Sequence, residues 1–197
     1  MLNMKNLFTR ALLALMLVTG AGAASAGPTY HVTLNTAGYD GTGAIDFILT
    51  GYDAQPSTAF LSNFTGDFLS GSDTVGDVSG SIGTGLVIRA GEDFGEFAQK
   101  LNLGQRFGFD VSFDTGLVGL PAGFTVGVFS DTLGTWLGAT GNLVAFELTP
   151  GQPALIDVDA PFANVNVVSE VPEPATLASL ALGLALMGST LRARRKQ

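Results

Sequence analysis

The sequence predicts an all-β protein whose main domain, residues 27–170, is an antiparallel β-sandwich or jelly roll. Two observations carry this prediction. Short stretches in which apolar and polar residues alternate recur at intervals of about 8 to 15 residues, as expected of half-buried strands. Turn-forming residues separate these stretches, including many of the 27 glycines in the chain. No clear helix lies between them, which disfavours a parallel sheet built from βαβ units.

Residues 105–114 give the clearest strand. Large apolar side chains occupy every second position and small or acidic ones lie between them: Phe107, Phe109, Val111 and Phe113 on one face, Gly108, Asp110, Ser112 and Asp114 on the other. Burying such a face contributes on the order of 2 kcal/mol for each large side chain, before chain entropy is subtracted. We therefore expect this strand at the centre of the core.

The same alternation predicts further strands over residues 30–36, 44–50, 85–90, 124–129, 143–149, 154–159 and 164–169, with weaker signals at 60–64 and 75–82. Residues 92–103 are ambiguous. Phe94, Phe97 and Leu101 have helical spacing, whereas nearby glycines disfavour a helix and fit a strand pair or a short helical turn equally well. The dipeptide Asp40-Gly41 is a hairpin signal between the first two strands.

The first 26 residues have the pattern of a secretory signal peptide. Lys5 and Arg10 precede a short apolar run, residues 11–18, and small residues follow at the positions that a signal peptidase recognises: Ala24, Ala26 and then Gly27. Cleavage after Ala26 would leave Gly27 as the first residue of the exported chain. The alternative is a permanent N-terminal anchor, which the shortness of the run disfavours.

Residues 171–197 combine three features in a fixed order. A proline-rich triplet comes first, in the run Val171, Pro172, Glu173, Pro174 and Ala175. An uncharged apolar segment, residues 175–191, follows; as a helix it would be about 25 Å long, enough to span a bilayer core of about 30 Å if flanking arginines reach the interface. A basic cluster comes last, typical of the cytoplasmic side of a membrane span: Arg192, Arg194, Arg195 and Lys196. The alternative is an amphipathic or buried helix, but the run has no polar face.

This tail, VPEPATLASLALGLALMGSTLRARRKQ, closely resembles the PEP-CTERM sorting signal of Gram-negative bacteria. The resemblance covers the tail alone. It implies that an exosortase, a membrane transpeptidase, recognises the tail, cuts near the triplet and passes the protein to the cell surface or extracellular matrix. The implied partners are the exosortase and, at least transiently, the membrane, with extracellular polysaccharide of a biofilm matrix as a further expected partner. The implied route is export through the inner membrane as a membrane-anchored precursor.

The charge of the main domain excludes one class of partner. Residues 27–170 hold 16 acidic side chains against three basic ones, a net charge of about −13. Nucleic acid is therefore not expected to bind, because phosphate recognition needs clustered cations. The chain has no cysteine, so we expect neither disulfides nor a thiolate metal site, and no pattern in it calls for a cofactor.

The sequence offers little for catalysis. It contains no nucleophile-elbow, P-loop, zinc-protease or dinucleotide motif. His31, the only histidine, is expected to be a solvated strand residue. Glycosidases need paired carboxylates, but close acidic pairs such as Asp110 and Asp114 arise by chance in so acidic a domain.

Two binding hypotheses remain. Asp67, Asp73 and Asp77 lie in a loop-like stretch, residues 66–80, whose oxygens could hold calcium. Trp136, the only tryptophan, is expected to be buried, although an exposed tryptophan could stack on a sugar ring. The domain is thus interpreted as a non-enzymatic surface or matrix protein; the alternative is a carbohydrate-binding module or, less favoured, a carbohydrate-active enzyme.

Overall fold

The computed structural model describes residues 27–53 and 56–169, which form thirteen β-strands and contain no helix. The prediction of an all-β fold with antiparallel sheets is confirmed. The predicted signal peptide, residues 1–26, and the predicted tail, residues 171–197, lie outside the described residues. Within the described ranges, no helix has the length and apolar character that crossing a membrane requires.

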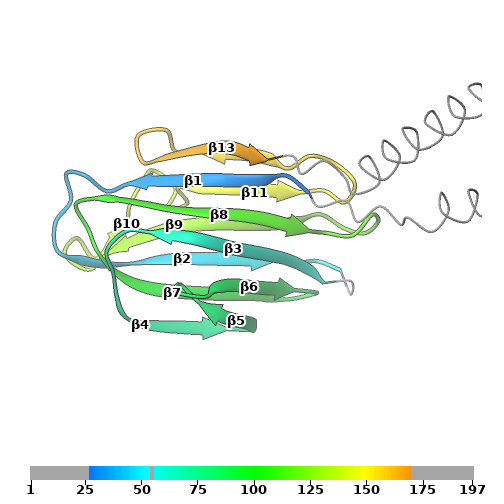
Figure 1. The fold of residues 1–197 in the computed structure, drawn as a ribbon, viewed down its shortest axis with the longest axis horizontal. Coiled ribbons are helices and arrows are strands. Elements are labelled where there is room, and N and C mark those ends of the chain that lie inside the picture. The colour runs from blue at the N-terminus through cyan, green and yellow to red at the C-terminus, as the bar shows by residue number, and fades with distance from the viewer. Residues whose placement is uncertain (1–26, 54–55, 170–197) are drawn as a thin grey trace, which may run out of the picture. The chain divides into compact units, whose positions relative to one another are not determined.

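The strands form two antiparallel sheets that pack face to face (Figure 1). The first sheet has the order β13 (Ala163–Ser169), β1 (Thr29–Asn35), β8 (Arg106–Asp114), β3 (Ser57–Thr65), β6 (Gly85–Ala90) and β5 (Asp77–Ser81). The second has the order β12 (Leu155–Val158), β11 (Val144–Leu148), β9 (Ala122–Ser130), β2 (Thr42–Thr50), β7 (Phe94–Asn102) and β4 (Phe68–Val75), and the two-residue β10 (Thr135–Trp136) pairs with β9.

Six of the first eight strands pair in a nested order. β1 pairs with β8, β2 with β7 and β3 with β6, so the chain behaves as a long ribbon folded back on itself and rolled into two sheets. This nested order is jelly-roll-like. Strands β9, β11 and β12 then extend the second sheet, and β13 extends the first. The hairpin predicted at Asp40-Gly41 is wrong, because β1 and β2 belong to different sheets and the turn carries the chain across the core.

The core lies between the two sheets and is rich in phenylalanine. Phe47 of β2 meets Phe109 of β8 edge-on, with ring centroids 5.1 Å apart, and so joins the sheets directly. Phe47 also stacks on Phe124 of β9. The strand predicted at the centre of the core, observed as β8, pairs with β1 on one side and with β3 on the other, and its Phe107, Phe109 and Val111 are buried.

The ambiguous stretch, residues 92–103, is the strand β7. Its alternation of apolar and polar residues is interrupted because Gln99, a polar residue, occupies an inward position between the buried Phe97 and Leu101. The Gln99 amide donates hydrogen bonds to the carbonyls of Leu69 and Gly71, at 2.5 and 3.0 Å. These carbonyls belong to a bulge in β4, where the register with β7 shifts. A bulge leaves backbone groups without partners in the neighbouring strand, and here the Gln99 side chain provides the missing hydrogen bonds.

Candidate functional site

Trp136 lies on the outer face of the second sheet, and its side chain is 43 % exposed. The expectation that it is buried is wrong. Its strand, β10, pairs only with the end of β9, which places the ring outside the sheet, edge-on to Phe129 with centroids 5.5 Å apart. The ring also lies over Gly127, where a Cβ atom would come within 3.0 Å of it. The site therefore offers a partly open aromatic ring on a small-residue floor.

Asp46 lies beside this floor, since it is the β2 partner of Gly127. It is buried, and its Oδ1 atom has no hydrogen-bond partner among the described residues. Burial, and to a smaller extent the negative charge of Glu96, raise the pKa of Asp46 to about 6. A carboxyl group in this state takes up a proton close to neutral pH.

A groove of about 640 Å³ opens at one end of the same outer face. Small residues of β9 and β11, including Gly123, Thr125 and Ala145, form its floor, while Tyr52, Leu120 and Pro121 of two loops line its side. Glu147 is the charged residue that lines it. The groove is thus largely apolar, and sequence analysis did not identify it.

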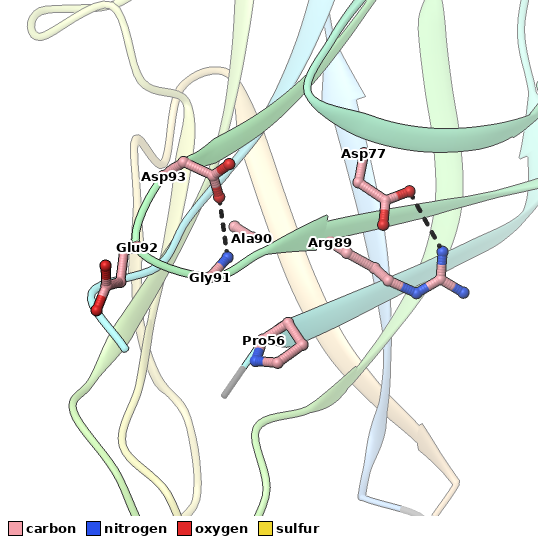
Figure 2. Close-up of a pocket in the computed structure, with 7 residues that line it drawn as sticks. All are labelled: Pro56, Asp77, Arg89, Ala90, Gly91, Glu92 and Asp93. Carbon is pink, nitrogen blue, oxygen red and sulfur yellow. Dashed lines mark hydrogen bonds and ion pairs between the residues drawn. The ribbon is translucent and has the colours of Figure 1, made fainter. Parts of the chain in front are cut away.

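A second, smaller pocket of about 320 Å³ surrounds Arg89 (Figure 2). Figure 2 shows the guanidinium facing Asp77 across the β5–β6 pair, at 3.6 Å between Nη1 and Oδ1, while Asp93 turns back to accept a 3.0 Å hydrogen bond from the Gly91 amide. Glu92 also lines the pocket. Both partners of the ion pair are well exposed, so the pair adds little to stability.

The three residues of the calcium hypothesis are not brought together into one cluster. Asp67 precedes β4 and accepts a 2.7 Å hydrogen bond from Asn102. Asp73 lies on β4 of the second sheet, whereas Asp77 lies on β5 of the first sheet and pairs with Arg89. No group of three or more histidine, aspartate or glutamate side chains within residues 27–53 and 56–169 is placed to hold a metal ion. The geometry gives the hypothesis no support.

A polar cluster on the outer face of the first sheet joins residues far apart in sequence. His31 of β1 lies opposite Asp110 of β8, with 2.6 Å between Nδ1 and Oδ1, and Asn63 donates a 2.7 Å hydrogen bond to the other carboxylate oxygen. Asn63 has a φ of 54° where the register of β3 shifts. Sequence analysis treated His31 as a solvated strand residue and missed this pairing, for which the sequence carries no local signal.

The predicted sorting and processing residues lie outside the described residues: Ala24, Ala26, Val171, Pro172, Glu173, Pro174, Ala175, Arg192, Arg194, Arg195 and Lys196. Gly27 is described, and it precedes β1. The last described strand, β13, ends at Ser169.

Comparison with known proteins identifies this tail. Residues 170–196 match the family model described as the PEP-CTERM protein-sorting motif. No curated protein and no solved structure matches the chain. The motif indicates export and membrane-associated sorting, and it implies processing by an exosortase. The chain therefore carries a PEP-CTERM sorting motif over residues 170–196.

Proposed function

We propose that this protein is a non-enzymatic component of the cell surface or extracellular matrix, delivered there as folded cargo after an exosortase removes its tail. One observation carries the proposal: the sorting motif begins at residue 170, directly after β13 ends at Ser169. A cut near the Pro-Glu-Pro triplet would release all thirteen strands with only a few residues attached. The signal peptide predicted over residues 1–26 supplies the export step that this route needs.

The distribution of charge supports an exported, soluble cargo. The two-sheet domain carries a net charge of about −13, which keeps a protein soluble and separate from other polyanions. The predicted basic cluster lies only in the tail, where it would stay on the cytoplasmic side. His31 lines neither of the two pockets described above, and its Nδ1 atom is occupied by Asp110.

The proposal is tested by changing the triplet without changing the apolar segment. Glu173→Gln should trap the protein as a tailed precursor in the membrane fraction, and so should neutral replacement of the four basic residues 192 and 194–196. Glu170→Gln is the matched control, because it removes the same charge three residues upstream and leaves the triplet intact. Cell fractionation and immunoblotting measure the outcome. Normal release of the Glu173→Gln variant would contradict recognition of the triplet.

Carbohydrate binding is a second candidate function, and the exposure of Trp136 favours it. Aromatic rings with one open face stack on sugar rings, and here Phe129 supports the tryptophan ring edge-on. The acidic surface favours a neutral polysaccharide over an anionic one.

Tryptophan fluorescence tests this candidate directly, since Trp136 is the only tryptophan. Extracellular polysaccharide purified from the producing cells should shift the emission to the blue, and Trp136→Phe should weaken retention of the protein on the immobilised polymer. Leu133→Ala, which alters an exposed apolar residue of the adjoining turn, is the control and should leave retention unchanged. An emission maximum that stays unchanged at a saturating concentration of the polysaccharide would contradict the carbohydrate-binding hypothesis.

A further inference from the structure

Large apolar side chains are exposed together at one end of the two sheets. We call this group of five residues the apolar tip; its members are Tyr52, Leu117, Val118, Leu120 and Leu155. Leu117 and Val118 are 83 % and 78 % exposed, and the other three are more than half exposed. Monomeric proteins rarely expose contiguous apolar surface of this kind unless it contacts a partner.

The three segments that carry the apolar tip are connected to one another. The Leu120 amide donates a 3.0 Å hydrogen bond to Asp53, which ties the loop before β9 to the loop after β2. The Leu117 carbonyl lies 3.6 Å from the position of a Cβ atom on Gly151, so the same loop adjoins the turn between β11 and β12. Tyr52 and Leu120 also line the same groove. The tip is therefore one surface and not five isolated side chains.

The apolar tip lies at the end from which the chain leaves the sheets. β2, β8, β11 and β13 all end on this side, as Figure 1 shows, and Ser169 at the end of β13 pairs with Thr29 at the start of β1. A hydrogen bond between Tyr30 and the Ala154 backbone ties the start of β1 to the turn that precedes Leu155. Ser169, the residue that directly precedes the sorting motif in the sequence, thus lies at the same end of the domain as the exposed apolar residues.

We propose that the apolar tip contacts the lipid surface of the membrane while the tail is inserted. This inference rests on the proposed function, together with the bilayer span that the sequence predicts over residues 175–191. The five residues 170–174 can extend over at most about 18 Å, so the end that carries the tip must stay close to the bilayer during that stage. Apolar side chains at such an interface leave water for the boundary between headgroups and acyl chains.

The charged residues around the apolar tip determine which lipid headgroups it can approach. Asp53 and Glu147 flank it, and Arg89, a cation at this end of the described sheets, is paired with Asp77. Acidic neighbours repel anionic headgroups, so the tip fits a zwitterionic lipid surface better than an anionic one. Contact with lipid would also orient the domain, so that Trp136 and the other loops at the far end of β9 face away from the membrane.

Leu120 and Leu133 provide a matched pair of positions for the test. They are the same residue type, their exposed fractions are 57 % and 56 %, and they lie beyond opposite ends of the nine-residue strand β9, which is about 30 Å long. The chain has no cysteine, so Leu120→Cys and Leu133→Cys each introduce a unique thiol. The full chain, labelled with an environment-sensitive fluorophore and reconstituted into phosphatidylcholine vesicles, is the system to measure.

The inference predicts a blue-shifted emission at position 120 that nitroxide-labelled lipids quench, and a solvent-like, unquenched emission at position 133. Adding Leu117→Asp and Val118→Asp should abolish both the shift and the quenching at 120, because charged residues oppose lipid contact. Alkaline carbonate extraction reports separately whether the tail is inserted. Extraction of the whole chain would overturn the spanning tail and the inference with it. A retained chain with solvent-like emission at 120 would overturn the inference alone, as would a blue shift without lipid quenching, which indicates a protein partner.

Discussion

His31 and Asp110 form a 2.6 Å contact between Nδ1 and Oδ1 directly across the β1–β8 pair. The second oxygen of Asp110 accepts a hydrogen bond from Asn63, so one carboxylate links β1, β8 and the irregular end of β3. Burial acts to raise the pKa of Asp110, but the hydrogen bonds from Asn63 and His31, together with the charge of His31, outweigh it and lower the pKa. The ionised carboxylate therefore stabilises the folded state.

Replacing Asp110 should cost stability in a pH-dependent manner. A carboxyl group whose pKa is lowered by folding contributes stability above its ordinary pKa of about 4, and this contribution is lost as the pH falls through the lower folded-state pKa. We expect Asp110→Asn to destabilise the protein by about 1 kcal/mol at neutral pH and to match the wild type in strong acid. Thermal unfolding of the full chain in detergent, at a series of pH values, measures this. Ser112→Ala, on the same strand face, should show no such dependence, and a constant difference for Asp110→Asn would contradict the account.

Asp46 should show the opposite dependence. Its pKa of about 6 means that the folded state binds the proton more tightly than the unfolded state does, so folding stability rises as the pH falls from above 6 to below about 4. Asp46→Asn keeps the size of the side chain and removes the buried charge. We expect it to raise the free energy of unfolding at pH 7.5 by about 1 to 3 kcal/mol, with the gain disappearing in acid. Asp73→Asn, an exposed change on β4, which β7 separates from β2, is the control; equal effects of the two changes would argue against a burial cost at Asp46.

Phe47 should be a main determinant of stability, because it joins the two sheets through Phe109. Phe47→Ala removes a fully buried ring and leaves a cavity, which we expect to cost about 3 to 5 kcal/mol. Phe60→Ala removes the same number of atoms from a ring that is 44 % exposed on β3, and should cost far less. Chemical denaturation of both variants compares them, and similar losses would contradict a core centred on Phe47.

Gly127 should control the position of Trp136. An alanine there would place its Cβ atom 2.8 Å from the Gly141 carbonyl and 3.0 Å from the tryptophan ring, so the ring must move outward. Gly127→Ala should therefore shift the emission of the single tryptophan to the red. Gly123→Ala, on the same strand face with nothing within 4 Å of the new atom, should leave it unchanged. A red shift in the Gly123 variant alone would be inconsistent with the ring lying over Gly127.

The sequence predicts those parts of the molecule whose signals are local. β8 follows from strict alternation, and the tail is one contiguous pattern of triplet, apolar segment and basic cluster. β4 is missed because its side chains are mostly exposed and so carry no alternation, and β7 is ambiguous because Gln99 occupies an inward position. The contact between His31 and Asp110 joins residues 79 positions apart, which depends on strand order and has no local signature. The prediction for Trp136 is wrong because its exposure depends on a tertiary feature: β10 pairs with the C-terminal end of β9, which leaves the tryptophan ring on the outer face of the sheet.

The central claim is that the two-sheet domain reaches the cell exterior after losing its tail. Mass spectrometry of both termini of the protein recovered from the cell surface and medium tests it most directly. The account predicts a chain that begins at Gly27 and ends between Val171 and Ala175. Recovery of the protein only from the inner membrane, with its sequence intact to Gln197, would contradict it.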